Sequence, residues 1–174
     1  MTPTAEIPPS SELTSQSGPN IWYFAYGANM STAILTGKRE VKPLAHKRAT
    51  LPDFSLVFDV RGVPYAEPAL ASLRRRSAHP GQIYGSGAEM AACGVAYLVT
   101  TADFCKIIAT EGAGVAYKVQ EVRAVVIGGL KSGVQGAGIQ LDPTEENLTV
   151  RTLIARRPER SLRLPSARYF ADFE

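Results

Sequence analysis

Glu111 is the residue of this sequence whose surroundings most favour acid–base chemistry. It ends the segment TTADFCKIIATE, in which Phe104, Ile107 and Ile108 have the spacing of an amphipathic helix. At 100° per residue, Glu111 projects between Phe104 and Ile107, inside the apolar stripe where a carboxylate is ordinarily excluded. Burial there disfavours the ionised carboxylate, which suits a general base that works near neutral pH.

The place of Glu111 along this helix adds a second penalty. Gly112 is a natural residue to follow a helix, so Glu111 lies in the last turn, where the helix dipole disfavours negative charge by roughly 0.3 to 1 kcal/mol. Thr100 and Asp103 have the spacing of a capping box, and the pattern predicts a helix over residues 103–111. An unwound last turn that releases the carboxylate to water is the alternative, and periodicity alone supports both.

The stretch FAYGANM, residues 24–30, is the second candidate for chemistry. The β-prone run IWYFAY leads into Gly27, and STAILTG follows with the composition of a short helix that stops at Gly37. Unpaired backbone N–H groups at such a helix start attract an anion, and Gly27 and Ala28 would let it approach closely. The alternative is an ordinary connection that Asn29 or Ser31 caps.

Other reactive side chains carry weaker signals. His46 and His79 have no nearby nucleophile motif and no second metal ligand, so both are predicted to be surface residues. Cys93 and Cys105 have neither a metal-ligand spacing nor a disulfide framework, and we expect both to be core thiols. The sequence therefore implies no metal site and no cofactor.

Length and composition favour one domain without a membrane or nucleic-acid partner. The 174 residues are 45% hydrophobic, enough for one core, and residues 1–20 predict a disordered polar tail before a domain over residues 21–174. No segment approaches the ~18 apolar residues of a membrane span and no signal peptide is recognisable, so a cytoplasmic location is expected. The net charge of +3 is small, and the arginine clusters lack interleaved aromatic residues.

Strands outnumber helices in the predicted order of elements. Besides residues 21–26, strands are expected at FSLVFDV, ALASLRR, CGVAYLVT, AYKVQEVRAVVI and NLTVRTLIARR. A Gly-rich run over residues 128–147 predicts a long hairpin loop. The order lacks the regular alternation of a doubly wound fold, so we predict an α+β fold with a mixed, curved or barrel-like β-sheet and a few flanking helices.

Three segments resemble the γ-glutamylcyclotransferase family. YFAYGANM is similar to the family signature YFAYGSNM, LPDFSLVF resembles the next strand, and the segment from CGVAYLVT to AYKVQEV resembles the one that carries the catalytic glutamate. The resemblance runs from Tyr23 to about Tyr169 and keeps the order of the motifs. It implies that Glu111 is the general base and that the loop binds a γ-glutamyl group. The implied substrate-binding residues are Tyr26, Gly27, Ala28, Asn29, Met30 and Tyr169.

The implied reaction is an intramolecular aminolysis. The α-amine of a small-molecule γ-glutamyl substrate attacks its own γ-carbonyl, which forms 5-oxoproline and releases an amine or amino acid. The substrate would be a γ-glutamyl amino acid, a γ-glutamylamine, glutathione or a glutathione-derived adduct, and the sequence does not choose among them. The enzyme would be a monomer or homodimer and would need neither metal nor redox cofactor.

Two departures from the family pattern support an alternative. Ala28 replaces the usual serine, which removes a hydroxyl but leaves the backbone donors. The sequence ends at Glu174, five positions after Tyr169, where family members continue into another helix. A shortened domain or an incomplete gene product is therefore expected. Both departures also suit a non-catalytic protein that binds γ-glutamyl ligands through a degenerate site.

Overall fold

The computed structural model describes residues 18–63, 67–76, 90–111, 115–128 and 143–159 of the 174. Most of the predicted polar tail, His79 and Tyr169 lie outside the described residues, as do residues 129–142 of the predicted hairpin loop. No helix in the described part of the chain has the length and hydropathy of a membrane span.

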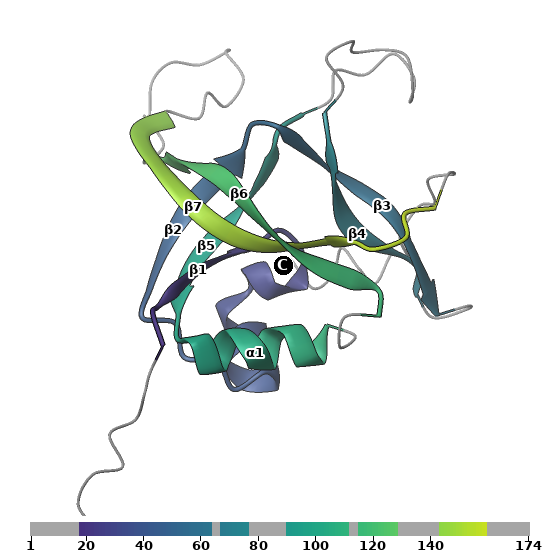
Figure 1. Ribbon diagram of the computed structural model, residues 1–174, viewed down its shortest axis with the longest axis horizontal. Helices are drawn as coiled ribbons and strands as arrows, with labels where there is room; N and C mark the ends of the chain where they lie inside the picture. The colour runs from purple at the N-terminus through teal and green to yellow at the C-terminus, as the bar shows by residue number, and fades with distance from the viewer. Residues whose placement is uncertain (1–17, 64–66, 77–89, 112–114, 129–142, 160–174) are drawn as a thin grey trace, which may run out of the picture.

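Five strands form a closed barrel (Figure 1). Their order around the barrel is β1 (Ile21–Ala25), β5 (Ala92–Val99), β2 (Ala45–Leu51), β6 (Tyr117–Ile127) and β7 (Pro143–Ala155). Neighbouring strands are antiparallel except β1 and β7, which pair in parallel where Tyr23 faces Arg151 and so close the barrel. The predicted mixed, barrel-like sheet is therefore confirmed.

A two-stranded sheet and a few short helices flank the barrel. Strands β3 (Phe54–Val63) and β4 (Glu67–Arg75) pair with each other, and β4 contacts β7. Helix α1 (Thr101–Thr110) follows β5 and contacts β1, and Figure 1 shows it beside the purple segment that follows β1. That segment contains the 3₁₀ turn η1 (Ala28–Met30) and the π-helical η2 (Ile34–Lys38).

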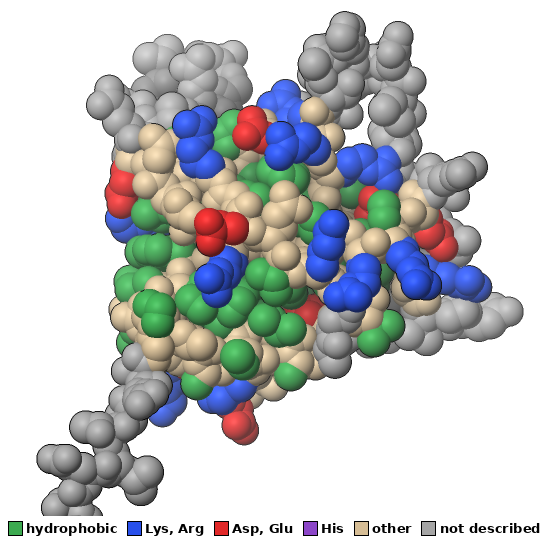
Figure 2. Space-filling model, in the orientation of Figure 1, with side chains coloured by type: hydrophobic (Ala, Val, Ile, Leu, Met, Phe, Trp, Pro, Cys, Tyr) green, Lys and Arg blue, Asp and Glu red, His purple; other side chains and the backbone are tan. Residues whose placement is uncertain are grey.

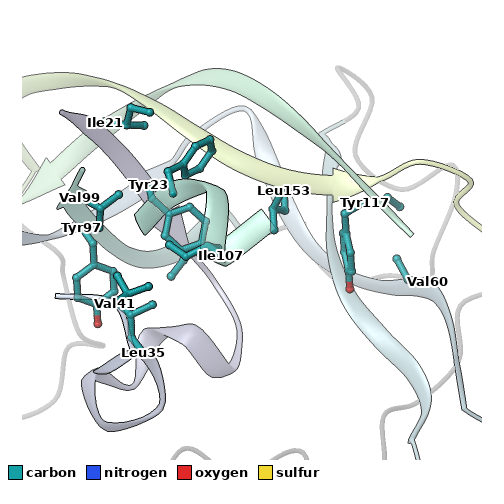
Figure 3. Packing of buried hydrophobic residues seen from close by; sticks show 13 residues of the cluster. Ile21, Tyr23, Leu35, Val41, Val60, Tyr97, Val99, Ile107, Tyr117 and Leu153 are labelled. Atoms are coloured by element: carbon teal, nitrogen blue, oxygen red, sulfur yellow. The ribbon is translucent and has the colours of Figure 1, made fainter. Parts of the chain in front are cut away.

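The apolar core joins α1 and η2 to the barrel. Figure 3 shows Tyr23, Leu35, Val41 and Ile107 in one cluster of buried side chains, and Leu35, Val41 and Ile107 have no exposed surface. Burial of each such side chain stabilises the fold by about 1.5 to 3 kcal/mol relative to exposure. Packing of α1 and η2 onto β1 therefore fixes the surroundings of the loop that follows β1.

Gly94 lets β1 and β5 approach each other closely. A Cβ atom at this position would lie 2.2 Å from the carbonyl oxygen of Ala25 and 2.7 Å from the Phe24 ring. Phe24 and Ala25 are both completely buried, so neither can move aside cheaply. The lack of a side chain at Gly94 thus allows the close strand pairing that positions the end of β1 immediately before the loop.

Several local predictions are wrong. Strand β2 was not predicted. Its consecutive polar residues His46, Lys47 and Arg48 interrupt the alternation of apolar and polar residues, and the buried residues Ala49 and Leu51 lie only at its end. Strand β7 begins at Pro143, inside the predicted loop over residues 128–147.

The predicted helix stop at Gly37 is also wrong, because η2 includes this glycine and continues to Lys38. Cys93 and Cys105 are exposed rather than buried as core thiols, because Cys93 points outward from β5 and Cys105 lies on the outer face of α1. In both cases the orientation depends on which face of the element packs on the barrel.

Candidate active site

Helix α1 presents Glu111 at its C-terminal end. The Thr100 hydroxyl accepts a 3.1 Å hydrogen bond from the backbone N–H of Asp103, which confirms the predicted cap. The backbone N–H of Glu111 donates to the carbonyl oxygens of Ile107 and Ile108 at 3.1 and 3.3 Å. The last turn is therefore closed, and the alternative in which it unwinds is wrong.

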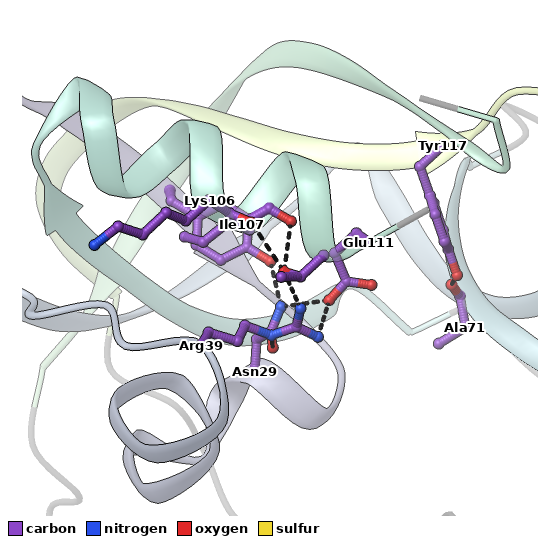
Figure 4. Close-up of polar contacts among 9 residues, drawn as sticks. Asn29, Arg39, Ala71, Lys106, Ile107, Glu111 and Tyr117 are labelled. Carbon is purple, nitrogen blue, oxygen red and sulfur yellow. Dashed lines mark hydrogen bonds and ion pairs between the residues drawn. The ribbon is translucent and has the colours of Figure 1, made fainter. Parts of the chain in front are cut away.

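The Glu111 carboxylate is anchored through one oxygen. Asn29 Nδ2 donates to Oε1 at 2.8 Å, and the Arg39 guanidinium pairs with the same oxygen (Figure 4). Within the described residues no hydrogen bond reaches Oε2. The Glu111 side chain is 24% exposed. Arg39 thus places a positive charge beside Oε1, while Oε2 stays available to accept a proton.

Asn29 connects three functional side chains through its amide group. Its Oδ1 accepts from Arg39 Nε at 2.6 Å, and its Nδ2 donates to the Tyr23 hydroxyl at 3.0 Å and to Glu111. Only this amide orientation fits, because a guanidinium cannot accept a hydrogen bond and a carboxylate cannot donate one. The predicted helix cap by Asn29 or Ser31 is wrong, since neither η1 nor η2 has a side-chain cap.

Arg39 is a functional candidate that the sequence did not indicate. It donates to Asn29, Thr110 and Glu111, and its side chain is only 16% exposed. Glu40 follows with a φ of 52°, a left-handed conformation that turns the chain back directly after Arg39. No periodicity or motif around Arg39 distinguishes it from a solvated cation, so only its spatial neighbours reveal the role.

Tyr23 supplies a neutral hydroxyl beside Glu111. The side chain is 3% exposed, and burial raises the pKa of Tyr23 well above its ordinary value, with the nearby Glu111 charge acting in the same direction. The hydroxyl thus stays protonated over the physiological pH range. It accepts from Asn29, so its own hydrogen is left to donate to another oxygen.

A cavity of about 150 Å³ brings most of the predicted site together. Of the predicted residues, those that line it are Tyr26, Gly27, Ala28, Asn29 and Glu111; the others are Tyr23, Arg39, Leu70, Ala71, Tyr117 and Leu153. Met30 does not line it and instead packs against the core, with its carbonyl oxygen bound to Tyr97. Tyr169 lies outside the described residues, so its place is not tested.

The loop offers backbone donors to this cavity. The N–H groups of Met30 and Ser31 bind the carbonyl oxygens of Gly27 and Ala28, whereas those of Ala28 and Asn29 have no partner among the described residues. Gly27 has a φ of −129° and so does not adopt a left-handed backbone conformation. The residues that line the cavity thus combine donors for an oxygen anion with an acceptor for a proton. The described residues contain no cluster of three or more potential metal ligands.

Comparisons with known proteins find relatives of one family. The chain is 36% identical over 159 residues to γ-glutamyl cyclotransferase verK of Clonostachys rogersoniana, covering 88% of this chain and 83% of that protein. It is also 36% identical to γ-glutamyl cyclotransferase gliK of Aspergillus fumigatus, covering 86% of this chain but only 53% of that longer protein. No family model matches the chain.

The fold is also found among solved structures. A structure named γ-glutamyl cyclotransferase matches with a TM-score of 0.58 at 17% identity and covers 87% of this chain and 74% of its own. At this identity, the match establishes the shared fold.

Proposed function

The chain belongs to the γ-glutamylcyclotransferase family, and we propose that it cleaves a γ-glutamyl amide by intramolecular aminolysis. The products would be 5-oxoproline and a free amine or amino acid. The observation that carries the proposal is the Glu111 carboxylate, held through one oxygen by Asn29 and Arg39 at the wall of a cavity that the loop after β1 also lines.

In the proposed reaction, Glu111 acts as the general base through Oε2. It takes a proton from the substrate α-ammonium, and the resulting amine attacks the γ-carbonyl carbon of the same molecule. Protonated Glu111 returns this proton to the leaving nitrogen as the tetrahedral intermediate collapses and the C–N bond of the amide breaks. The ring nitrogen then gives its second proton, through Glu111, to the freed amine, so that 5-oxoproline keeps one N–H and the amine departs as an ammonium ion. Because nucleophile and electrophile belong to one molecule, the protein mainly has to hold the substrate in a folded conformation.

The loop and Tyr23 would stabilise the negative oxygens of the substrate. The N–H groups of Ala28 and Asn29 and the Tyr23 hydroxyl are neutral donors near Glu111, suited to a carboxylate or to the developing oxyanion. The cavity of about 150 Å³ is smaller than the roughly 300 to 1,000 Å³ of pockets that enclose drug-sized ligands. It therefore suits the glutamyl end of a substrate rather than a whole peptide.

Arg39 is a positioning residue in this scheme. Its donors already serve Asn29, Thr110 and Glu111, so the guanidinium orients the carboxylate instead of binding substrate. The ion pair with Arg39 engages Oε1 and leaves Oε2 for the proton transfer.

A second candidate function is binding without turnover. Ala28 favours it, because the serine hydroxyl of the family loop is missing from a position that lines the cavity. Incubation with γ-glutamyl dipeptides and glutathione, followed by mass-spectrometric detection of 5-oxoproline, separates the two functions. We expect 5-oxoproline in equal amount to the released amine. Saturable binding by calorimetry without product would instead establish the binding protein.

A further inference from the structure

A second cavity shares part of its lining with the first, including Glu111. It has a volume of about 310 Å³ and is lined by Ile108, Glu111, Tyr117, Lys118, Val119, Leu153 and Arg156. Glu111, Tyr117 and Leu153 line both cavities. A substrate with its glutamyl end in the first cavity would therefore place the group beyond the scissile bond in the second.

Two cations, Lys118 and Arg156, line this second cavity. Lys118 and Arg156 are exposed, and neither side chain makes a hydrogen bond or ion pair with a described residue. The backbone N–H of Arg156 donates to the Ala116 carbonyl oxygen at 2.9 Å, which holds Arg156 beside the start of β6. The carboxylate of Glu111, which lines the cavity, is already paired with Arg39.

The positive charge continues beyond the second cavity. A neighbouring hollow of about 280 Å³ shares Lys118 and Arg156 and adds Arg74 and Arg75. Asp59 also lines this hollow, and its carboxylate is paired with Arg74 at 2.7 Å. Figure 2 shows Lys and Arg side chains gathered on the side of the molecule where β3, β4 and the end of β7 lie. A negatively charged group entering from this side would meet a surplus of cations.

We propose that the second cavity binds a carboxylate of the leaving group through Lys118 and Arg156. The inference rests on the proposed function and narrows its substrate class: the chain prefers γ-glutamyl amino acids and γ-glutamyl peptides with a free carboxylate over neutral γ-glutamylamines. Glu111 lies between the two subsites, next to the nitrogen that must receive the proton.

The test compares substrates that differ only in this charge. Glutathione is paired with its C-terminal amide, and γ-glutamylalanine with γ-glutamylalaninamide; kcat and KM are measured from 5-oxoproline formation. We expect the free carboxylate to be preferred by roughly fourfold to 25-fold in kcat/KM, mainly through KM, if each of the two exposed pairs contributes about two- to fivefold. The preference should decrease at high salt.

Variants assign the preference to particular residues. Lys118→Gln and Arg156→Gln should each lower the preference by about two- to fivefold, and the double variant should bring it near one while the amides react as before. Arg123→Gln is the matched control. Arg123 is an exposed cation on β6, the strand that also carries Lys118, but it lines none of these cavities.

The outcomes separate this inference from the proposed function. Equal kcat/KM for acid and amide, with 5-oxoproline formed, overturns the carboxylate subsite and leaves the activity intact. An equal loss for acid and amide in the variants overturns it too, because that pattern indicates a structural role. If no substrate reacts, the proposed function is wrong, and calorimetric titration with the same acid and amide pairs then decides the charge preference: equal affinities overturn it.

Discussion

Asn29 Nδ2 lies 2.8 Å from Glu111 Oε1, although 82 positions separate the two residues in the chain. The antiparallel pairing of β1 with β5 explains the contact, because Val99 at the end of β5 lies beside Ile21 at the start of β1. Helix α1 then runs back along β1. Its 10 residues span about 15 Å, close to the roughly 17 Å of the 5-residue strand, so Glu111 ends opposite the loop.

Glu111→Gln should lower kcat by about 10²- to 10⁴-fold, because the amide retains size and hydrogen bonding but cannot accept the proton. The readout is 5-oxoproline formation at saturating substrate, with thermal melting as the control for folding. Activity near that of the wild type in a normally melting variant would show that another group is the base.

Arg39→Lys should lower kcat by about 10- to 100-fold, because a hydrogen bond to a charged group contributes about 1.5 to 3 kcal/mol and lysine lacks the planar fork that reaches Asn29, Thr110 and Glu111 together. The exposed neighbour Lys38 provides a matched control in Lys38→Gln, which should react normally. A near-normal kcat of Arg39→Lys together with a lowered kcat of Lys38→Gln would mean that only the net charge near the site matters.

Ala28→Ser should raise kcat/KM only modestly, by up to about tenfold, since a neutral hydrogen bond contributes about 0.5 to 1.5 kcal/mol and the backbone donors are already present. Steady-state kinetics of both proteins with one γ-glutamyl dipeptide checks this. Turnover that appears only in the serine variant would identify the natural chain as a degenerate enzyme.

Gly94→Ala should destabilise the fold by about 1 to 3 kcal/mol or more, because the new methyl group would lie 2.2 Å from the carbonyl oxygen of Ala25. Gly37→Ala is the control: nothing lies within 4 Å of a Cβ there, so stability should be unchanged or slightly higher. Denaturant unfolding measures both. A stable Gly94→Ala variant would show that β1 and β5 separate readily.

Asp103→Asn should cost about 0.3 to 1 kcal/mol at pH 7, and the cost should fade in acid. Desolvation acts to raise the pKa of Asp103, but the hydrogen bond and charge of Lys106, together with hydrogen bonds from the Lys42 backbone and the Thr100 hydroxyl, hold it below the ordinary value. A carboxyl group with a lowered folded-state pKa stabilises the protein above its unfolded pKa of about 3.9, and this stability is lost as pH falls through the folded value.

Unfolding at pH 7, 5 and 3 checks the Asp103→Asn prediction. We expect the difference in free energy of unfolding between wild type and variant to be similar at pH 7 and 5 and smaller at pH 3. A difference that does not change with pH would mean that the carboxylate charge contributes nothing to the start of α1.

The sequence by itself determined the features that depend on near neighbours. The cap at Thr100, the apolar face of α1 with Phe104 and Ile107, and the strand that ends before Gly27 all follow from residues a few positions apart. The position of Glu111 at the end of α1 also follows from residues close to it in the chain. The motif order indicated the family, and the mixed barrel-like sheet follows from many strands without regular alternation.

Only the tertiary structure decided which side chains meet. The pairing of Arg39 with Glu111, the bridging amide of Asn29 and the burial of the Tyr23 hydroxyl depend on the register of β1 against β5 and on the length of α1. Such contacts leave no periodic signal, because each partner is polar and would be equally suited to solvent at its own position. Their physical cause is the closed barrel, which brings distant segments together and excludes the water that would otherwise satisfy them.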